Sequence, residues 1–174
     1  MAVDTWIQTY TGAKVNPFDP DPDTIHIEDI AHALSNICRF TGHSKYFYSV
    51  AEHSWLVSKL VNEKYMLTGL LHDASEAYLT DVSRPVKPHL KGYIKLEHDL
   101  TKVIAEKFNL IYPFPSQVKK VDSRLCITEG KYLMPDITCW KLYGKVEPYK
   151  KVSIINYRPG TIKKYFLERF EELI

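Results

Sequence analysis

The stretch "LLHDASEAYLTD", residues 70–81, decides how the chain folds. It lies in a run that is apolar on almost every side of a helix, which is typical of a helix buried in the middle of a domain. The same stretch carries His72 and Asp73, followed by Glu76 and Asp81. Ionisable groups are costly to bury unless they are paired or bind a metal ion. The stretch therefore predicts a central helix, over about 63–79, that carries a polar site.

Apolar residues at helical spacing predict further helices on both sides of this one. Ser49 and Glu52 have the S-x-x-E spacing of a capping box, which predicts a helix start with Glu52 as the reciprocal acceptor. Asp23 or Thr24 can cap the first helix. The predicted helices cover about residues 27–38, 50–60, 63–79, 90–108, 116–133 and 161–173.

Little in the chain is typical of a sheet. Residues 13–24 hold three prolines and three aspartates, which predicts an irregular segment. Only "KVSIINY", residues 151–157, has a strand-like pattern, and one short strand makes no sheet. We therefore predict an all-α fold, a bundle of six or seven helices.

Length and charge narrow the classes of function. A chain of 174 residues can build its own core, which predicts one domain over 1–174. A net charge of +2 is too balanced to indicate a nucleic-acid or a membrane partner. No apolar run approaches the roughly 20 residues of a membrane span, and the start "MAVDTWIQTY" has no signal-peptide pattern. Three cysteines without CxxC spacing indicate reduced thiols in a cytoplasmic protein.

Polar residues on core faces are the most informative feature of the sequence. His53 lies on the apolar face of its predicted helix, and Asp122 and Glu129 share an apolar stripe on a later helix. If His53 and Asp122 converge with His72 and Asp73, they form a set of two imidazoles and two carboxylates. Such a set suits one divalent ion of Mn, Fe, Co, Ni or Zn.

Glu76 has a second possible role at this site. It follows His72 by four residues and Asp73 by three, so on a helix it lies one turn further along the same face. From there it can act as a general acid or base without binding the ion. An ordinary surface residue is the alternative interpretation, and the catalytic role is the one favoured. Asp81 falls just past the predicted helix end, where it can serve the rim of the pocket.

Three charged residues allow more than one interpretation. Asp122 is either a metal ligand or a buried partner of Arg124 or of a lysine. Glu129 either orients a histidine or pairs with Arg39. Lys87 either binds phosphate or is solvated in its loop.

These motifs resemble the HD-domain metal-dependent phosphohydrolases, which carry the series His, His-Asp, Asp. The segment "HDASEAYLTDVSRPVK", residues 72–87, is similar to the motif of their bacterial 5′-deoxynucleotidase branch, and "SVAEHS", residues 49–54, resembles its segment with the first metal histidine. "WIQTYTG" and "EDIAHALSNICRFTGH", at 6–12 and 28–43, are similar to small HD hydrolases of phages and prophages. The resemblance covers residues 5 to about 135 and implies an HD-domain helical bundle.

The resemblance implies a role for each matching residue. Glu76 matches the catalytic glutamate, and Asp81 matches an aspartate that contacts the deoxyribose or assists the chemistry. Arg39 and Phe40 match an Arg-Trp pair that holds phosphate and sugar. The metal ligands of the family match His53, His72, Asp73 and Asp122.

The chain also departs from the family pattern. Phe40 stands in place of the tryptophan, and Thr80-Asp81 in place of Gly-Asp. Only 19 positions separate His53 from His72, fewer than in the bacterial nucleotidases. The shorter segment bears on substrate size and oligomer contacts rather than on the metal site.

The expected activity is therefore the metal-dependent hydrolysis of a nucleotide 5′ phosphoester, with Arg39, Phe40 and Lys87 on the substrate. The substrate is a deoxynucleoside 5′-monophosphate, or a deoxynucleoside triphosphate that is split into deoxynucleoside and triphosphate. A catalytically silent nucleotide-binding module is the alternative from another class. We further expect Mg at a possible second site, a homo-oligomer, and a cytoplasmic location, in the host if a phage encodes the protein.

Overall fold

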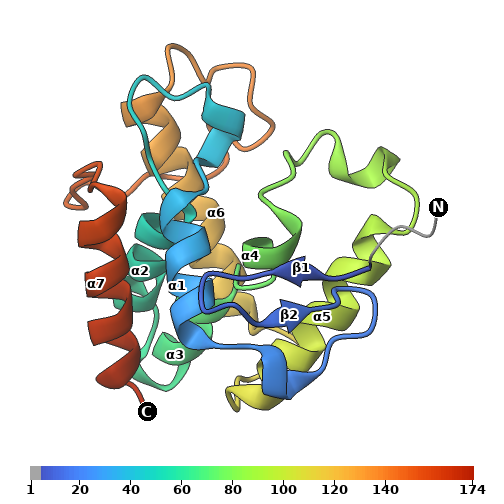
Figure 1. Ribbon diagram of the computed structural model, residues 1–174. Coiled ribbons are helices and arrows are strands. Elements are labelled where there is room, and N and C mark those ends of the chain that lie inside the picture. Colours follow the sequence, from blue (N-terminus) through green and yellow to red (C-terminus); the bar gives the residue numbers. More distant parts are fainter. Residues whose placement is uncertain (1–4) are drawn as a thin grey trace.

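The computed structural model describes residues 5–174 (Figure 1); residues 1–4, which belong to the start considered above for a signal peptide, lie outside the described part. The predicted helical fold is confirmed for the described residues. Its α-helices are α1 (Ile27–Asn36), α2 (Val50–Leu60), α3 (Met66–Leu71), α4 (Glu76–Leu79), α5 (Tyr93–Lys107), α6 (Ser116–Leu133) and α7 (Pro159–Glu171). Short 3-10 helices cover Pro22–Thr24, Arg39–Gly42, Glu63–Tyr65 and Lys87–His89.

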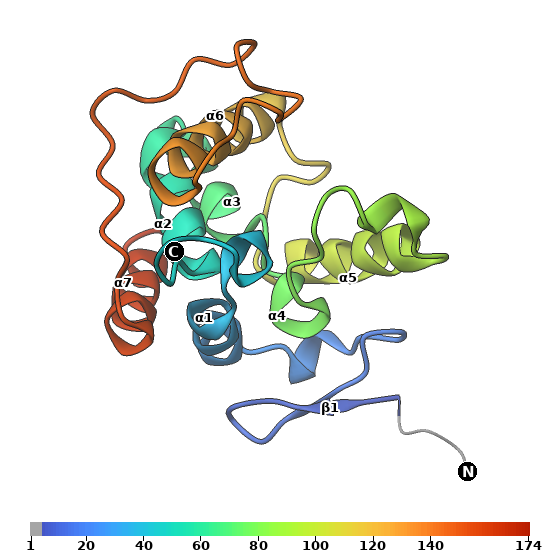
Figure 2. The same ribbon diagram turned by 90° about the horizontal axis from the view of Figure 1, so that it is seen from above.

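Helix α2 lies at the centre and packs against α1, α3, α6 and α7 (Figures 1 and 2). One apolar cluster joins α1, α3 and α7 to the start of α2, and a second joins the rest of α2 to α6. Helices α5 and α7 lie on opposite sides of this centre. Among residues 5–174, no helix has the length and apolar character needed to cross a membrane.

The predicted continuous helix over 63–79 is wrong. Helix α3 ends at Leu71, residues 72–75 form turns, and α4 begins at Glu76. Through these turns the backbone bonds tighten to the i→i−3 pattern, with the Glu76 N–H donating to the Asp73 carbonyl oxygen at 3.0 Å. The histidine and the aspartate of the opening stretch therefore lie in a bend between two short helices.

The predicted start of α2 is confirmed only in part. Ser49 Oγ accepts from the Glu52 backbone N–H at 3.1 Å, as a capping residue does. The Glu52 side chain, however, accepts from the backbone N–H groups of Ile155, Asn156 and Tyr157 at 2.9, 3.1 and 2.8 Å. It thus binds a distant segment instead of closing the capping box.

This contact explains why the strand-like pattern over 151–157 is not a strand. The segment is extended chain within the long connection that runs from α6 to α7 (Figure 2), and three of its N–H groups meet one carboxylate instead of a neighbouring strand. A small antiparallel hairpin of β1 (Ile7–Gln8) and β2 (Lys14–Val15) was not predicted.

The start of α1 also differs from the prediction. Its N-cap is His26, without a side-chain capping bond, because Asp23 and Thr24 belong to the preceding 3-10 helix. The buried carboxylate of Asp29 in α1 accepts from the Thr11 N–H and hydroxyl at 2.7 and 2.9 Å, which attaches the hairpin turn to the bundle.

Candidate metal centre

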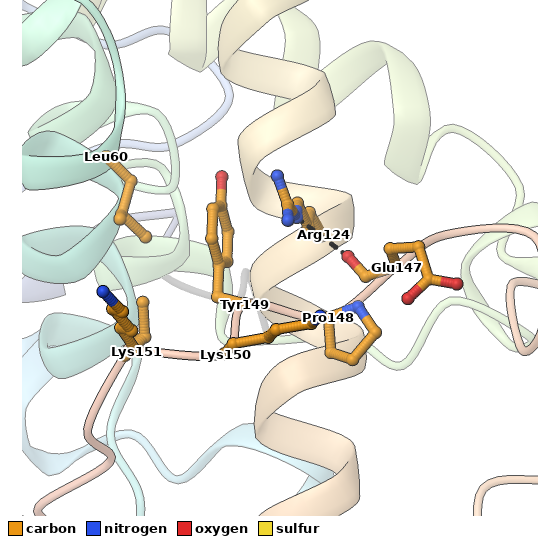
Figure 3. Close-up of a pocket in the computed structure, with 8 residues that line it drawn as sticks. Leu60, Arg124, Glu147, Pro148, Tyr149, Lys150 and Lys151 are labelled. Atoms are coloured by element: carbon orange, nitrogen blue, oxygen red, sulfur yellow. Dashed lines mark hydrogen bonds between the residues drawn. The ribbon is translucent and has the colours of Figure 1, made fainter.

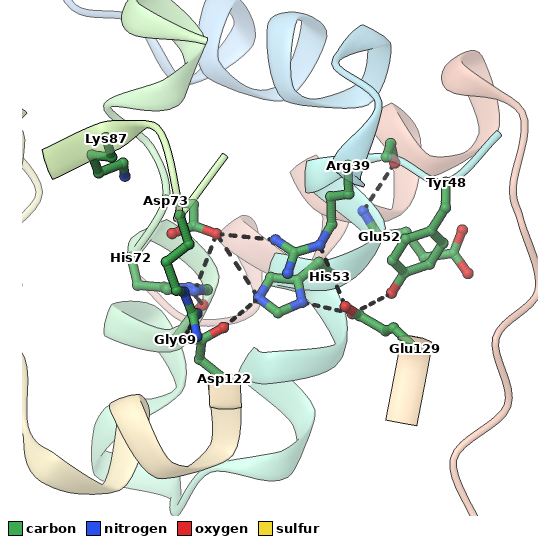
Figure 4. A network of polar contacts seen from close by, with 12 residues as sticks. Arg39, Tyr48, Glu52, His53, Gly69, His72, Asp73, Lys87, Asp122 and Glu129 are labelled. Carbon is green, nitrogen blue, oxygen red and sulfur yellow. Dashed lines mark hydrogen bonds and ion pairs between the residues drawn. The ribbon is translucent and has the colours of Figure 1, made fainter. Parts of the chain in front are cut away.

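Three elements bring the predicted metal ligands together: α2 with His53, the turn after α3 with His72 and Asp73, and α6 with Asp122 (Figure 4). One ligand atom each of His53, His72 and Asp122 lies within 4.8 Å of the others, so these three residues can hold a metal ion. Asp73 lies beside them, with Oδ2 at 3.3 Å from His72 Nε2 and 3.8 Å from His53 Nε2. The four residues that the sequence predicted as metal ligands therefore lie close together in the folded chain.

A glycine sets the distance between the two histidine-bearing elements. A Cβ at Gly69 of α3 would lie 3.1 Å from Val61 Cγ2 and 3.2 Å from Ser58 Cα on the α2 side. The absence of a side chain therefore lets α3 approach α2 closely. The ring of His53, on α2, and the ring of His72, just after α3, have their centroids 5.4 Å apart.

Both imidazoles present the same nitrogen to the centre. His53 Nδ1 lies 2.6 Å from Glu129 Oε1, and His72 Nδ1 lies 2.8 Å from the Gly69 carbonyl oxygen. Each Nδ1–H thus has an oxygen acceptor, while each Nε2 is buried and faces a carboxylate oxygen: Asp122 Oδ1 lies 3.2 Å from His53 Nε2, and Asp73 Oδ2 lies 3.3 Å from His72 Nε2. A histidine that binds a metal ion through one ring nitrogen usually donates the N–H of its other ring nitrogen to an oxygen acceptor.

Glu129 satisfies both interpretations that the sequence left open. Its Oε1 holds His53 and accepts from the Tyr48 hydroxyl at 2.7 Å, and its Oε2 lies 3.3 Å from Arg39 Nε. The same guanidinium lies 3.6 Å from Asp73 Oδ2 through its Nη1. No pattern in the sequence indicated Tyr48, because it lies in a loop and touches Glu129 only through the folded chain.

The charges of the centre are strongly coupled. Burial and Arg39 oppose protonation of His53, but the carboxylates of Glu129 and Asp122 outweigh them and raise its pKa to about 9. Burial would raise the pKa of Asp122 and Glu129, yet His53 and Arg39 lower both below the ordinary range. The centre therefore holds ionised carboxylates next to a positively charged His53. A metal ion that binds at Nε2 would displace the proton from that nitrogen.

Glu76 and Asp81 behave differently from these carboxylates. Burial, followed by the charges of Asp73 and Asp81, raises the pKa of Glu76 well above its ordinary value, and burial also raises the pKa of Asp81. Glu76 is 7% exposed, and its Oε2 has no hydrogen-bond partner in the described part of the chain. The surface interpretation of Glu76 is therefore wrong. The residue begins α4, just after the turn that carries His72 and Asp73, and so does not share one helix face with them.

Lys87 and Phe40, the other predicted substrate residues, have partners in the protein. Lys87 Nζ lies 2.6 Å from Glu97 Oε1. The Phe40 ring lies 5.6 Å from the ring of Trp140 and 5.5 Å from Arg39 Cζ, on a backbone with a left-handed φ of 56°. Their roles toward a substrate stay predictions.

The alternative partner of Asp122 is not Arg124. Arg84, whose side chain is 65% exposed, approaches Asp122 Oδ2 at 3.5 Å. Arg124 donates from Nε to the Glu147 carbonyl oxygen at 2.8 Å, in a separate hollow that Leu60, Tyr149 and Lys151 also line (Figure 3).

This chain is similar to curated proteins of two bacteria over nearly its whole length. No family model matches it. It is 36% identical to the uncharacterized protein YfdR of Escherichia coli over 170 residues, which cover 97% of this chain and 96% of that protein. It is 39% identical to the uncharacterized protein RCAP_rcc00048 of Rhodobacter capsulatus, with 97% of this chain and 95% of that protein covered. At this identity over nearly the whole of both chains, the protein belongs to the same family as YfdR.

Proposed function

We propose that this protein is a metal-dependent phosphohydrolase of the HD-domain type that cleaves the 5′ phosphoester of deoxynucleoside monophosphates. One observation carries the proposal. Two buried histidines, His53 and His72, have Nδ1 held by oxygen and Nε2 turned toward Asp122 and Asp73. The resemblance of residues 49–54 and 72–87 to the 5′-deoxynucleotidase motifs supplies the substrate class.

The donor set fits a divalent transition metal. His53, His72 and Asp122, with Asp73 beside them, would hold the ion, and two imidazoles with two carboxylates suit Mn, Fe, Co, Ni or Zn. When bound, such an ion supplies Lewis-acid stabilisation of phosphoryl charge and a water of lowered pKa.

The remaining residues have complementary tasks. Glu76, whose pKa is raised chiefly by burial, is the group that would give a proton to the leaving 5′ oxygen of the deoxyribose. Arg39 neutralises the non-bridging phosphate oxygens, a task that suits its planar fork of donors. Phe40 and Asp81 contact the sugar, and Lys87 adds positive charge on the substrate side.

A deoxynucleoside triphosphate is the second candidate substrate. The exposed guanidinium of Arg84 lies near Asp122, and the ammonium of Lys87 attracts the carboxylates of Glu76 and Asp73. Two cations beyond Arg39 can serve a longer phosphate chain.

The test is an assay of the metal-titrated protein with deoxynucleoside monophosphates and triphosphates, followed by product analysis. We expect free phosphate from the monophosphate. Triphosphate released from the triphosphate substrate would favour the second candidate, and no turnover with any divalent ion would leave a silent nucleotide-binding module. Asp73→Ala should lose metal and activity together, and a variant with a full metal complement would remove Asp73 from the ligand set.

A further inference from the structure

The two histidines of the centre are held in different ways. His72 Nδ1 meets the carbonyl oxygen of Gly69, three residues before it, so the local backbone orients this ring. His53 Nδ1 meets Glu129 Oε1, a side chain 76 residues away on α6. The orientation of His53 therefore depends on one distant carboxylate.

Glu129 is itself held from both ends. It is fully buried, with Tyr48 on the same oxygen as His53 and Arg39 on the other oxygen. A buried carboxylate is costly unless charged or hydrogen-bonding partners surround it. Here a hydroxyl, an imidazole and a guanidinium share that role, so the carboxylate has little freedom to turn away from His53 (Figure 4).

We propose that Glu129 is a positioning residue that fixes His53 with Nε2 toward the metal ion and strengthens this nitrogen as a ligand. Tyr48 and Arg39 keep the carboxylate in place. A carboxylate behind a ligating imidazole has this effect in metal sites generally, and its loss typically weakens metal binding by about 10–100-fold. The inference rests on the proposed function, since it takes His53 as a metal ligand.

The experiment is a titration with Co²⁺, followed by visible absorption, of the wild-type protein and Glu129→Gln. The control is Glu52→Gln, because Glu52 is an equally buried carboxylate whose partners are backbone N–H groups. We expect Glu129→Gln to bind Co²⁺ about 10–100-fold more weakly, with a changed spectrum. Glu52→Gln should bind it like the wild type.

The wild-type titration tests the proposed function, and the variant titration tests the role of Glu129. A wild-type protein that binds no Co²⁺ overturns the proposed function and this inference with it. Wild-type binding with unchanged affinity and spectrum in Glu129→Gln overturns only the positioning role, whatever the melting temperature does. If Glu129→Gln does not fold, Tyr48→Phe decides. The loss of one hydrogen bond to the carboxylate should weaken Co²⁺ binding by roughly fivefold, and unchanged affinity overturns the proposal.

Discussion

Two fully buried glutamates on either side of His53 show how differently one side chain can be used. Glu52, its neighbour in α2, accepts hydrogen bonds from three backbone N–H groups of residues 155–157. Glu129 on α6 accepts a hydrogen bond from the Tyr48 hydroxyl and lies against His53 and Arg39. Burial raises the pKa of Glu52 despite its three donors, whereas His53 and Arg39 outweigh burial and lower the pKa of Glu129.

The difference lies in the charge of the partners. Neutral backbone donors let Glu52 attach a long extended connection to the central helix, without linking it to the chemistry of the centre. Ionisable partners make Glu129 part of the electrostatics of the centre, because its charge favours the protonated form of His53 and balances the fixed positive charge of Arg39. We therefore expect the Glu52 side of His53 to govern stability and the Glu129 side to govern both stability and function.

The largest effect is expected for a residue on the functional side. Glu76→Ala should keep the metal yet lose rate by roughly 10²–10⁴-fold, because the leaving oxygen loses its proton donor. At tenfold per 1.36 kcal/mol this corresponds to about 2.7–5.4 kcal/mol of activation free energy. The measurements are metal content and kcat on a deoxynucleoside monophosphate. A variant with normal kcat would exclude Glu76 from the chemistry.

Glu129→Leu tests how much the contacts of Glu129 with His53 and Arg39 stabilise the fold. The substitution leaves Arg39 and His53 buried without their shared counter-charge, so we expect a loss of about 3–5 kcal/mol in the free energy of unfolding. Urea unfolding of the metal-free protein measures it. A loss below about 1 kcal/mol would contradict a buried ionic network here.

Glu52→Gln tests the contacts between Glu52 and the extended segment 155–157. The amide keeps one acceptor oxygen for three N–H donors, so the free energy of unfolding should fall by about 1–3 kcal/mol. Chemical denaturation measures this loss, and metal affinity should stay at the wild-type value. If metal affinity fell as far as in Glu129→Gln, the distinction between the two glutamates would be lost.

Ser49→Ala should have the smallest effect. It removes the side-chain acceptor for the Glu52 N–H at the start of α2 and should cost about 1 kcal/mol of stability, as N-cap losses do. Thermal unfolding with and without metal measures it. A drop in metal affinity larger than the drop in stability would show that the helix start also positions His53.

Much of the helical fold and the metal-ligand candidates could be predicted from the sequence. The predicted range 116–133 coincides with α6, because apolar residues recur at helical spacing over its whole length. The break at residues 72–75 could not be predicted, since the same apolar run fits one long helix as well as two short ones. The partners of Glu52 were missed because a capping-box pattern is local and the segment that it binds lies about a hundred residues away.

The sequence by itself determined which residues are candidates for the metal centre. Histidines and carboxylates on apolar faces are costly to bury alone, so their presence in the pattern predicted a shared site. Only the tertiary structure decided how they are held: the bend that carries His72, the carbonyl behind it, and the network of Tyr48, Glu129 and Arg39 behind His53. The physical reason is that periodicity reports the local environment of each residue, whereas a hydrogen bond between residues 76 positions apart exists only after the helices have packed.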